Sequence, residues 1–208
     1  MVPKLESQQQ IERDLSRTFP KNTYFKPGEN GHRKLKNVLR AFASYDNQAD
    51  YVQGMNFLVG QLLFHCSDTL SFWLFVELIE NYELRDIYQD GLPGLKKHAY
   101  IIQMLVKDHL PRLAKHFEEH QVRTEMYASD WIFSLFASVL PETNSKVTST
   151  FFTYFFRYRW EFFYKLILSI LEHIQDTILE CSDMFSILQQ IKIAMSNKND
   201  PYNYVMAY

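Results

Sequence analysis

Two short stretches of the sequence carry side chains that could act on a partner molecule. The first is IERDLSR, residues 11–17, in which Asp14 and Arg17 are three residues apart. On a helix this spacing lets the carboxylate accept hydrogen bonds from the guanidinium and hold it in place. The helix must end soon afterwards, because Pro20 cannot continue it. We therefore expect Arg17 at a helix exit, from which it could reach out of its own protein; an ordinary surface ion pair is the alternative.

The second stretch is YVQGMN, residues 51–56. At the start of a helix, Tyr51 and Met55 would face the interior and Gln53 would face solvent. Gly54 costs about 1 kcal/mol relative to alanine in a helix. We therefore expect that the backbone turns at this glycine or that another group approaches it closely. The residue types alone do not assign catalysis to Gln53.

Other chemistries find little support. Neither G-x-x-x-x-G-K nor G-x-G-x-x-G can be drawn through the six glycines, and there is no G-x-S-x-G motif. Residues 116–120 read H-x-x-E-H, which on a helix could direct His116 and His120 toward one zinc ion. These histidines flank the apolar Leu113 and Phe117 on an amphipathic helix, and no third ligand motif follows. We expect no metal site.

Composition narrows the class of protein. The 208 residues are 47% hydrophobic and 22% charged, and the net charge of −2 gives no reason to expect nucleic acid as a partner. Cys66 and Cys181 fit buried thiols in a reducing compartment. The polar N-terminus is not a signal peptide. Four charges interrupt the apolar stretch 150–171, so we expect no transmembrane segment and a cytoplasmic location.

The elements that position these side chains are predicted to be helices throughout. Apolar residues recur with a period near 3.6 in residues 35–45, 52–63 and 70–79. Further helices are expected at about 94–109, 112–121, 130–140, 147–157, 160–174 and 176–194. Asp68 or Thr69 is the expected cap of one helix and Ser129 or Asp130 of another, and Pro141 should end the helix that contains Trp131. Residues 18–32, rich in Pro, Gly and Asn, should form a loop.

The ordered set of motifs resembles the TBC family of Rab GTPase-activating proteins. I-x-x-D-x-x-R followed by T-F-P resembles the family's arginine-finger motif, and Y-x-Q-G-M-N resembles its glutamine-finger motif. The helix with Trp131 and the sequence Leu140-Pro141, and the aromatic segment from Trp160 to Leu171, follow in the family's order. The resemblance covers about residues 8–194. It implies one all-α domain of roughly ten or more helices, with lobes at about 8–110 and 111–194 and a tail at about 195–208.

The sequence departs from the family at three places, one of which is the tail after about residue 195, for which the family offers no match. The family's usual first helices, which carry Arg and Trp, have no counterpart here, so the resemblance implies a domain that is partial at its N-terminus. A Trp-Asp pair and an acidic-Gly pair are replaced by Phe152-Thr153 and Tyr158-Arg159. We expect altered packing of the C-terminal lobe from these replacements, without direct loss of chemistry.

The resemblance also implies a mechanism. Arg17 and Gln53 would be the catalytic residues, supplied in trans to a Rab-family small GTPase in its GTP-bound form. GTP and Mg²⁺ would belong to that partner, so this chain would need no cofactor and no substrate pocket of its own. The implied setting is vesicle trafficking, with peripheral attachment to endomembranes through the partner. Supporting roles fall on Asp14, which would orient Arg17, and on Tyr51, Gly54 and Asn56. The alternative is a non-catalytic helical module that binds a small GTPase or another protein.

Overall fold

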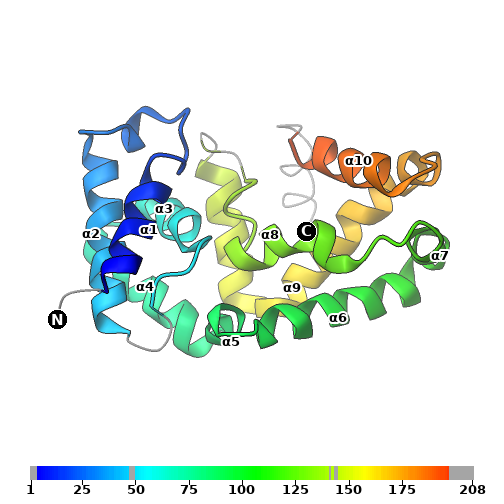
Figure 1. Ribbon diagram of the computed structural model, residues 1–208, viewed down its shortest axis with the longest axis horizontal. Helices are drawn as coiled ribbons and strands as arrows, with labels where there is room; N and C mark the ends of the chain where they lie inside the picture. The colour runs from blue at the N-terminus through cyan, green and yellow to red at the C-terminus, as the bar shows by residue number, and fades with distance from the viewer. Residues whose placement is uncertain (1–3, 47–49, 141, 143–144, 197–208) are drawn as a thin grey trace. The chain divides into compact units, whose positions relative to one another are not determined.

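Every regular element is helical in the residues that the computed structural model describes, which are 4–46, 50–140, 142 and 145–196 (Figure 1). This confirms the all-α prediction. The α-helices are α1 Leu5–Leu15, α2 Asn30–Tyr45, α3 Met55–His65, α4 Asp68–Asn81, α5 Leu84–Tyr88, α6 Pro93–His109, α7 Pro111–Glu119, α8 Thr124–Ser134, α9 Ser145–Leu179 and α10 Met184–Ser196, and a short 3₁₀ helix covers Thr23–Phe25.

The chain forms two compact units. The first contains the residues up to 94 together with 133–138 and 142–145, and the second contains 95–132, 139–141 and the residues from 146 onward. This division differs from the expected one near residue 110. Gly94 still packs against α5, where an added Cβ would lie 2.5 Å from the Ile87 nitrogen. The segment 133–138 returns to the first unit because its carbonyl groups accept hydrogen bonds there, from the Tyr88 hydroxyl at Phe133 (2.6 Å) and from the Gln61 amide at Ala137 (3.2 Å).

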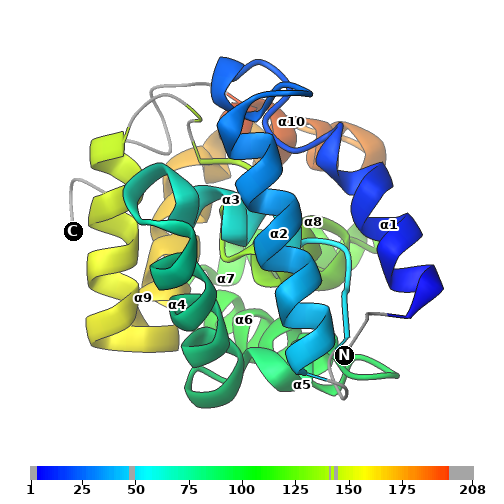
Figure 2. The same cartoon turned by 90° about the vertical axis from the view of Figure 1, so that its left-hand side faces the viewer.

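The first unit is built around α2. This helix contacts α1, α3 and α4, and Figure 2 shows it with α1 on one side and α4 on the other. Its inward face is the apolar stripe read from the sequence, now buried: Leu35, Val38, Leu39 and Phe42. Removing each such side chain from water contributes about 1.5–3 kcal/mol. The α3 helix is buried around most of its circumference, so the segment that precedes it is anchored to the core.

Several helix boundaries differ from the sequence predictions. The cap of α4 is Ser67, whose hydroxyl accepts a hydrogen bond from the Leu70 amide at 3.3 Å, so the assignment to Asp68 or Thr69 is wrong. Ser129 and Asp130 lie inside α8, which begins at Thr124 and ends at Ser134. Leu135 and Phe136 with positive φ follow that end. Pro141 therefore does not end α8, and it lies outside the described residues. The predicted loop 18–32 contains the 3₁₀ helix and gives way to α2 at Asn30.

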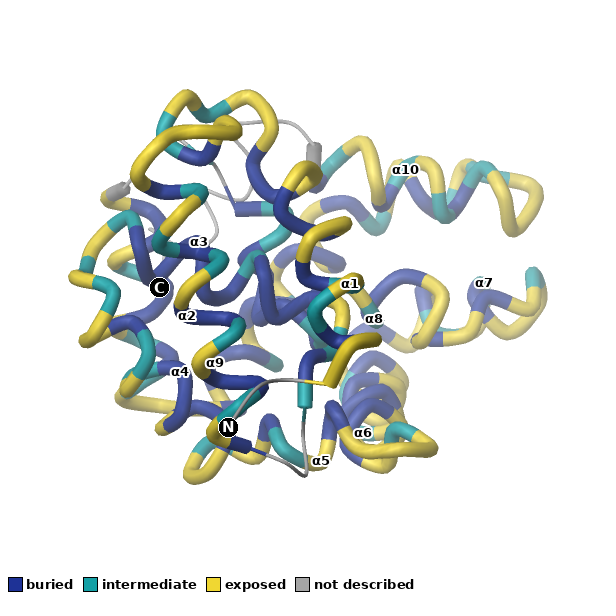
Figure 3. The backbone as a smooth tube through the Cα atoms, turned by 60° about the vertical axis from the view of Figure 1, so that its left-hand side comes forward, coloured by how far each residue is buried: buried dark blue, intermediate teal, exposed yellow. Residues whose placement is uncertain are grey.

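The second unit is held by long helices with an aromatic interior. The α9 helix is interrupted at Arg159 (φ 54°, ψ −137°), close to the predicted boundary between two helices at 157–160. Its buried rings include Phe151, Phe155, Phe162 and Phe163. The α9 helix ends at Leu179 and α10 begins at Met184, so the single helix predicted at 176–194 is wrong. Buried and exposed stretches alternate along α4 and α10, as expected of amphipathic helices (Figure 3).

Two further expectations concern the whole chain. Both cysteines are free and half-buried, whereas the sequence predicts buried ones. Partial burial raises the pKa of the Cys66 thiol. Among the described residues, no helix combines the length and the apolar composition needed to cross a bilayer.

Candidate functional site

Arg17 lies in the turn that follows α1, with its guanidinium held by the carboxylate of Asp14. The Arg17 Nη2 atom is 2.7 Å from Asp14 Oδ1, and the Arg17 amide donates to the Asp14 carbonyl at 3.2 Å. The two side chains differ in burial: 45% of Arg17 is exposed but only 1% of Asp14. An exposed surface ion pair has both partners in water, so that alternative does not describe this geometry. The guanidinium is tied to a buried carboxylate while the Arg17 side chain as a whole stays partly open to solvent.

The buried Asp14 carboxylate has three donors. Besides Arg17, Gln10 Nε2 donates to Oδ1 at 3.0 Å and the Tyr51 hydroxyl donates to Oδ2 at 2.6 Å. A buried carboxylate is tolerated only when its oxygens are satisfied in this way. Burial and the bond to Asp14 raise the pKa of Tyr51 well above its usual value. The Tyr51 hydroxyl therefore stays protonated and remains a donor.

Gln53 occupies a tight turn immediately before α3, with its side chain exposed. The turn depends on Gly54, which has φ +107°, a conformation that L-residues with side chains rarely adopt. An added Cβ at Gly54 would lie 3.2 Å from the Phe133 carbonyl oxygen and 3.3 Å from the Phe133 Cβ. Both expectations for this glycine are met, since the backbone turns there and another segment approaches closely. Tyr51 and Met55 are buried as predicted.

A hydroxyl group connects the two segments. The Thr18 Oγ1 atom donates to the Asp14 carbonyl at 2.7 Å and accepts from Asn56 Nδ2 at 2.8 Å. The Asn56 Oδ1 atom in turn accepts from the Gly54 amide at 3.1 Å. Thr18 and Asn56 are fully buried. One hydrogen-bonded network therefore joins the segment that carries Arg17 to the segment that carries Gln53.

The structure gathers most of the residues singled out in the sequence. Asp14, Arg17, Tyr51, Gly54 and Asn56 belong to the network, and Gln53 lies on the turn that the network holds. Sequence reasoning missed Gln10 and Thr18. Gln10 stands four residues before Asp14, a spacing at which helical Gln and Asp side chains meet, so a local signal existed. For Thr18 the sequence offered only its place in the T-F-P stretch after Arg17, and its bond to Asn56 could not be foreseen because the two residues are 38 positions apart.

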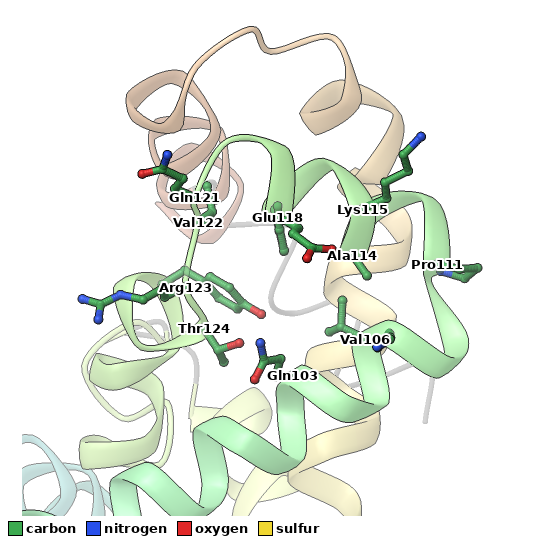
Figure 4. A pocket seen from close by; sticks show the side chains of 13 residues that line it. Gln103, Val106, Pro111, Ala114, Lys115, Glu118, Gln121, Val122, Arg123 and Thr124 are labelled. Atoms are coloured by element: carbon green, nitrogen blue, oxygen red, sulfur yellow. The ribbon is translucent and has the colours of Figure 1, made fainter.

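A cavity of about 530 Å³ lies elsewhere, in the second unit, and contains none of these residues. It is bordered by the end of α6, by α7 and by the start of α8. Figure 4 shows Glu118 directed inward and Lys115 directed away. The His116 and His120 rings pack against each other, with centroids 4.5 Å apart. Within the described ranges, no three His, Cys, Asp or Glu side chains come together as a metal site would require.

Comparison with known proteins places this chain in a family. Residues 2–179 match RabGAP-TBC, the Rab-GTPase-TBC domain. Rab GTPase-activating protein eat-17 of Caenorhabditis elegans is 38% identical over 131 residues, which are 63% of this chain and 15% of that protein. The ecotropic viral integration site 5 protein homolog of Homo sapiens is 29% identical over 191 residues, 91% of this chain and 23% of that protein. The chain thus spans under a quarter of either relative.

Solved structures agree with the assignment. The Chlamydomonas flagellar RabGAP TBC domain superposes with a TM-score of 0.83 at 25% identity, covering 98% of this chain and 67% of that one. The Ypt/Rab-GAP domain of Gyp1p superposes with a TM-score of 0.78 at 19% identity, covering 97% and 71%, which supports the fold alone. The family match extends over most of the chain, including both segments joined by the hydrogen-bonded network, and this chain belongs to the Rab-GTPase-TBC domain family.

Proposed function

We propose that this chain accelerates GTP hydrolysis on a Rab-type small GTPase by supplying Arg17 and Gln53 to the partner's active site. The observation that carries the proposal is the asymmetric Asp14–Arg17 pair, in which a buried, fully bonded carboxylate fixes a guanidinium that is half exposed. A side chain that is held at one end and open to solvent at the other is suited to entering another protein.

Arg17 would stabilise the negative charge that develops on the transferring phosphoryl group. Intrinsic GTP hydrolysis is slow because charge on the transferring phosphoryl group is poorly stabilised. A guanidinium placed between the β- and γ-phosphates neutralises that charge as it develops. Asp14 holds the guanidinium before the partner arrives, so less side-chain freedom is lost on binding. An arginine finger typically contributes about 10³–10⁵ in rate.

Gln53 would orient the water molecule that attacks the phosphoryl group. Its amide offers both a donor and an acceptor, so it can orient a water molecule for attack in place of the GTPase's own glutamine. The positive-φ turn at Gly54 and the bond from the Gly54 amide to Asn56 set the direction in which this side chain leaves the backbone. GTP and Mg²⁺ are carried by the partner in this mechanism.

A single-turnover assay tests the proposal. Phosphate release is measured from a panel of GTP-loaded Rab GTPases with the wild type, Arg17→Ala and the control Arg13→Ala, an exposed arginine one turn earlier on α1. We expect Arg17→Ala to lower the stimulated rate by about 10²-fold or more and Arg13→Ala to change it by less than about twofold. Arg17→Ala also removes the cation that pairs with the buried Asp14 carboxylate, so it should lower the melting temperature whereas Arg13→Ala should not. The rates are therefore compared well below the unfolding transitions of all three proteins.

Two results would contradict the proposal. If Arg17→Ala stimulates a responsive Rab as well as the wild type does, Arg17 is not the finger. If the wild type binds a Rab without accelerating hydrolysis by any member of the panel, the chain is the non-catalytic binding module.

A further inference from the structure

We infer that the Thr18 hydroxyl is a positioning group that sets the glutamine-bearing turn against the arginine-bearing turn. The inference rests on the proposed function and extends it to a residue outside the two finger side chains. Thr18 directly follows Arg17 and is fully buried, so it does not contact a partner itself. Its effect would pass through the hydrogen bonds that it makes with Asp14 and Asn56.

The directions of these bonds are determined by the groups involved. The Asp14 carbonyl can only accept, so the Thr18 hydroxyl must donate to it, and its lone pairs then accept from the Asn56 amide nitrogen. The opposite orientation of the Asn56 amide would place its NH₂ against the Gly54 N–H, donor against donor. Each hydrogen bond in the series that links Asp14, Thr18, Asn56 and Gly54 therefore has a fixed donor and a fixed acceptor. The series can form in only one arrangement.

Gln53 is bracketed by two connections to the arginine-bearing segment. On its N-terminal side, Tyr51 donates to the Asp14 carboxylate. On its C-terminal side, Gly54 is connected through Asn56 to Thr18. Loss of the Thr18 hydroxyl would remove the second connection and leave the first. The Asp14 carbonyl would keep its bond from the Arg17 amide, so the group left unsatisfied would be the buried Asn56 NH₂.

The test uses variants of nearly equal shape. Thr18→Val removes the hydroxyl, Thr18→Ser retains it, and Thr148→Val is a matched control at a buried threonine of the second unit. Single-turnover rates are measured across concentrations of the activator, which separates the maximal rate from the half-saturating concentration. We expect Thr18→Val to lower the maximal rate by about 10-fold with the half-saturating concentration changed less than about twofold, because misplacement impairs chemistry more than encounter. Thr18→Ser should stay within about threefold of wild type.

Measuring the effect of Thr18→Val in a protein that already carries Gln53→Ala separates positioning from simple destabilisation. When Gln53→Ala is already present, Thr18→Val should lower the rate by less than about twofold, because the side chain that it misplaces is gone. A loss that stays about 10-fold in that background would overturn the inference, as would a wild-type rate for Thr18→Val or an equal loss for Thr148→Val.

A measurement without a GTPase keeps this inference distinct from the proposed function. Amide hydrogen exchange of Gly54, followed residue by residue by NMR, should accelerate by about 10-fold in Thr18→Val and stay near wild type in Thr18→Ser and Thr148→Val. Unchanged exchange in Thr18→Val would overturn the coupling. If the wild type activates no Rab while the Gly54 amide responds as expected, the proposed function fails and the structural coupling stands.

Discussion

Both units of this chain have apolar cores with packed aromatic rings, as where Phe19 meets Phe25 and Phe64 in the first unit, but the first unit also contains a buried polar network. In the first unit, buried polar groups of Asp14, Thr18 and Asn56 form a directional network beneath the exposed Arg17 and Gln53. In the second unit, the buried face of α9 carries a set of packed aromatic rings. Hydrogen bonds depend strongly on angle and distance, whereas burial of apolar area is non-directional. The first unit thus adds directional bonds to its apolar core at the place where Arg17 and Gln53 reach the surface.

Trp160 illustrates the aromatic packing of the second unit. Its ring stacks on His98 with centroids 3.6 Å apart and meets Phe163 edge to face at 4.9 Å. The His98 Nδ1 atom is hydrogen-bonded to the Tyr164 hydroxyl at 2.6 Å. Such aromatic pairs add about 0.5–1.5 kcal/mol each beyond the area they bury. None of these residues belongs to the hydrogen-bonded network of the first unit.

The largest expected effect is on stability and lies in the second unit. Phe163→Ala should leave a cavity in the aromatic interior and lower the free energy of unfolding by about 3–5 kcal/mol. Urea denaturation measures this loss. The stimulated rate per folded molecule, taken well below the unfolding transition, should stay within about twofold of wild type. A large rate loss in fully folded protein would erase the functional contrast between the two units.

Gln53→Ala should produce the next largest effect, and on rate alone. We expect about a 10²-fold loss of stimulated hydrolysis, equivalent to about 2.7 kcal/mol of barrier, with an unchanged melting temperature. Gln189→Ala, at an exposed position on α10, is the control. A normal rate for Gln53→Ala would remove the role of the glutamine and leave that of Arg17 intact.

Gly54→Ala should affect both stability and rate. Alanine at φ +107° and close to the Phe133 carbonyl is expected to cost about 1–3 kcal/mol and to turn Gln53 away, lowering the rate several-fold. Gly91→Ala is the matched control, because Gly91 also has positive φ (77°) but an added Cβ there meets nothing within 4 Å. It should cost stability without a change in rate. Equal rate losses in both variants would show that backbone strain alone is responsible.

The last comparison concerns two ion pairs of equal length, of which the exposed pair should give the smallest effect. Lys165–Glu161 in the second unit and Arg17–Asp14 in the first both measure 2.7 Å, but the former is exposed on both sides. Glu161→Gln should change the free energy of unfolding by less than about 0.5 kcal/mol. Asp14→Asn should cost about 3 kcal/mol or more, because buried donors lose a charged acceptor. Similar values from denaturation of both variants would contradict the importance of burial for the Asp14 network.

Much of the fold could be predicted because helical periodicity is a local property. The stripe of α2 and the start of α6 follow from residue spacing within one helix. The differences arose where several neighbouring residues competed for one role or where a distant segment took part. Neighbouring polar residues compete to cap α4, and Ser67 has the backbone and hydroxyl position that reach the Leu70 amide. The compact units divide the chain differently from the expected lobes because 133–138 bonds to residues more than 40 positions away.

The sequence by itself predicted the pairing of Asp14 with Arg17, because a spacing of three residues in helical geometry places two side chains on one face, and Arg17 reaches Asp14 from the turn that follows α1. Only the tertiary structure decided that this carboxylate is buried, that Tyr51 donates to it, and that Thr18 meets Asn56. Those bonds join residues 37 and 38 positions apart and exist only once α1 and α3 have packed within the first unit. Burial then distinguishes this pair from a surface ion pair, because in the interior each buried polar atom must find a partner and the geometry becomes fixed.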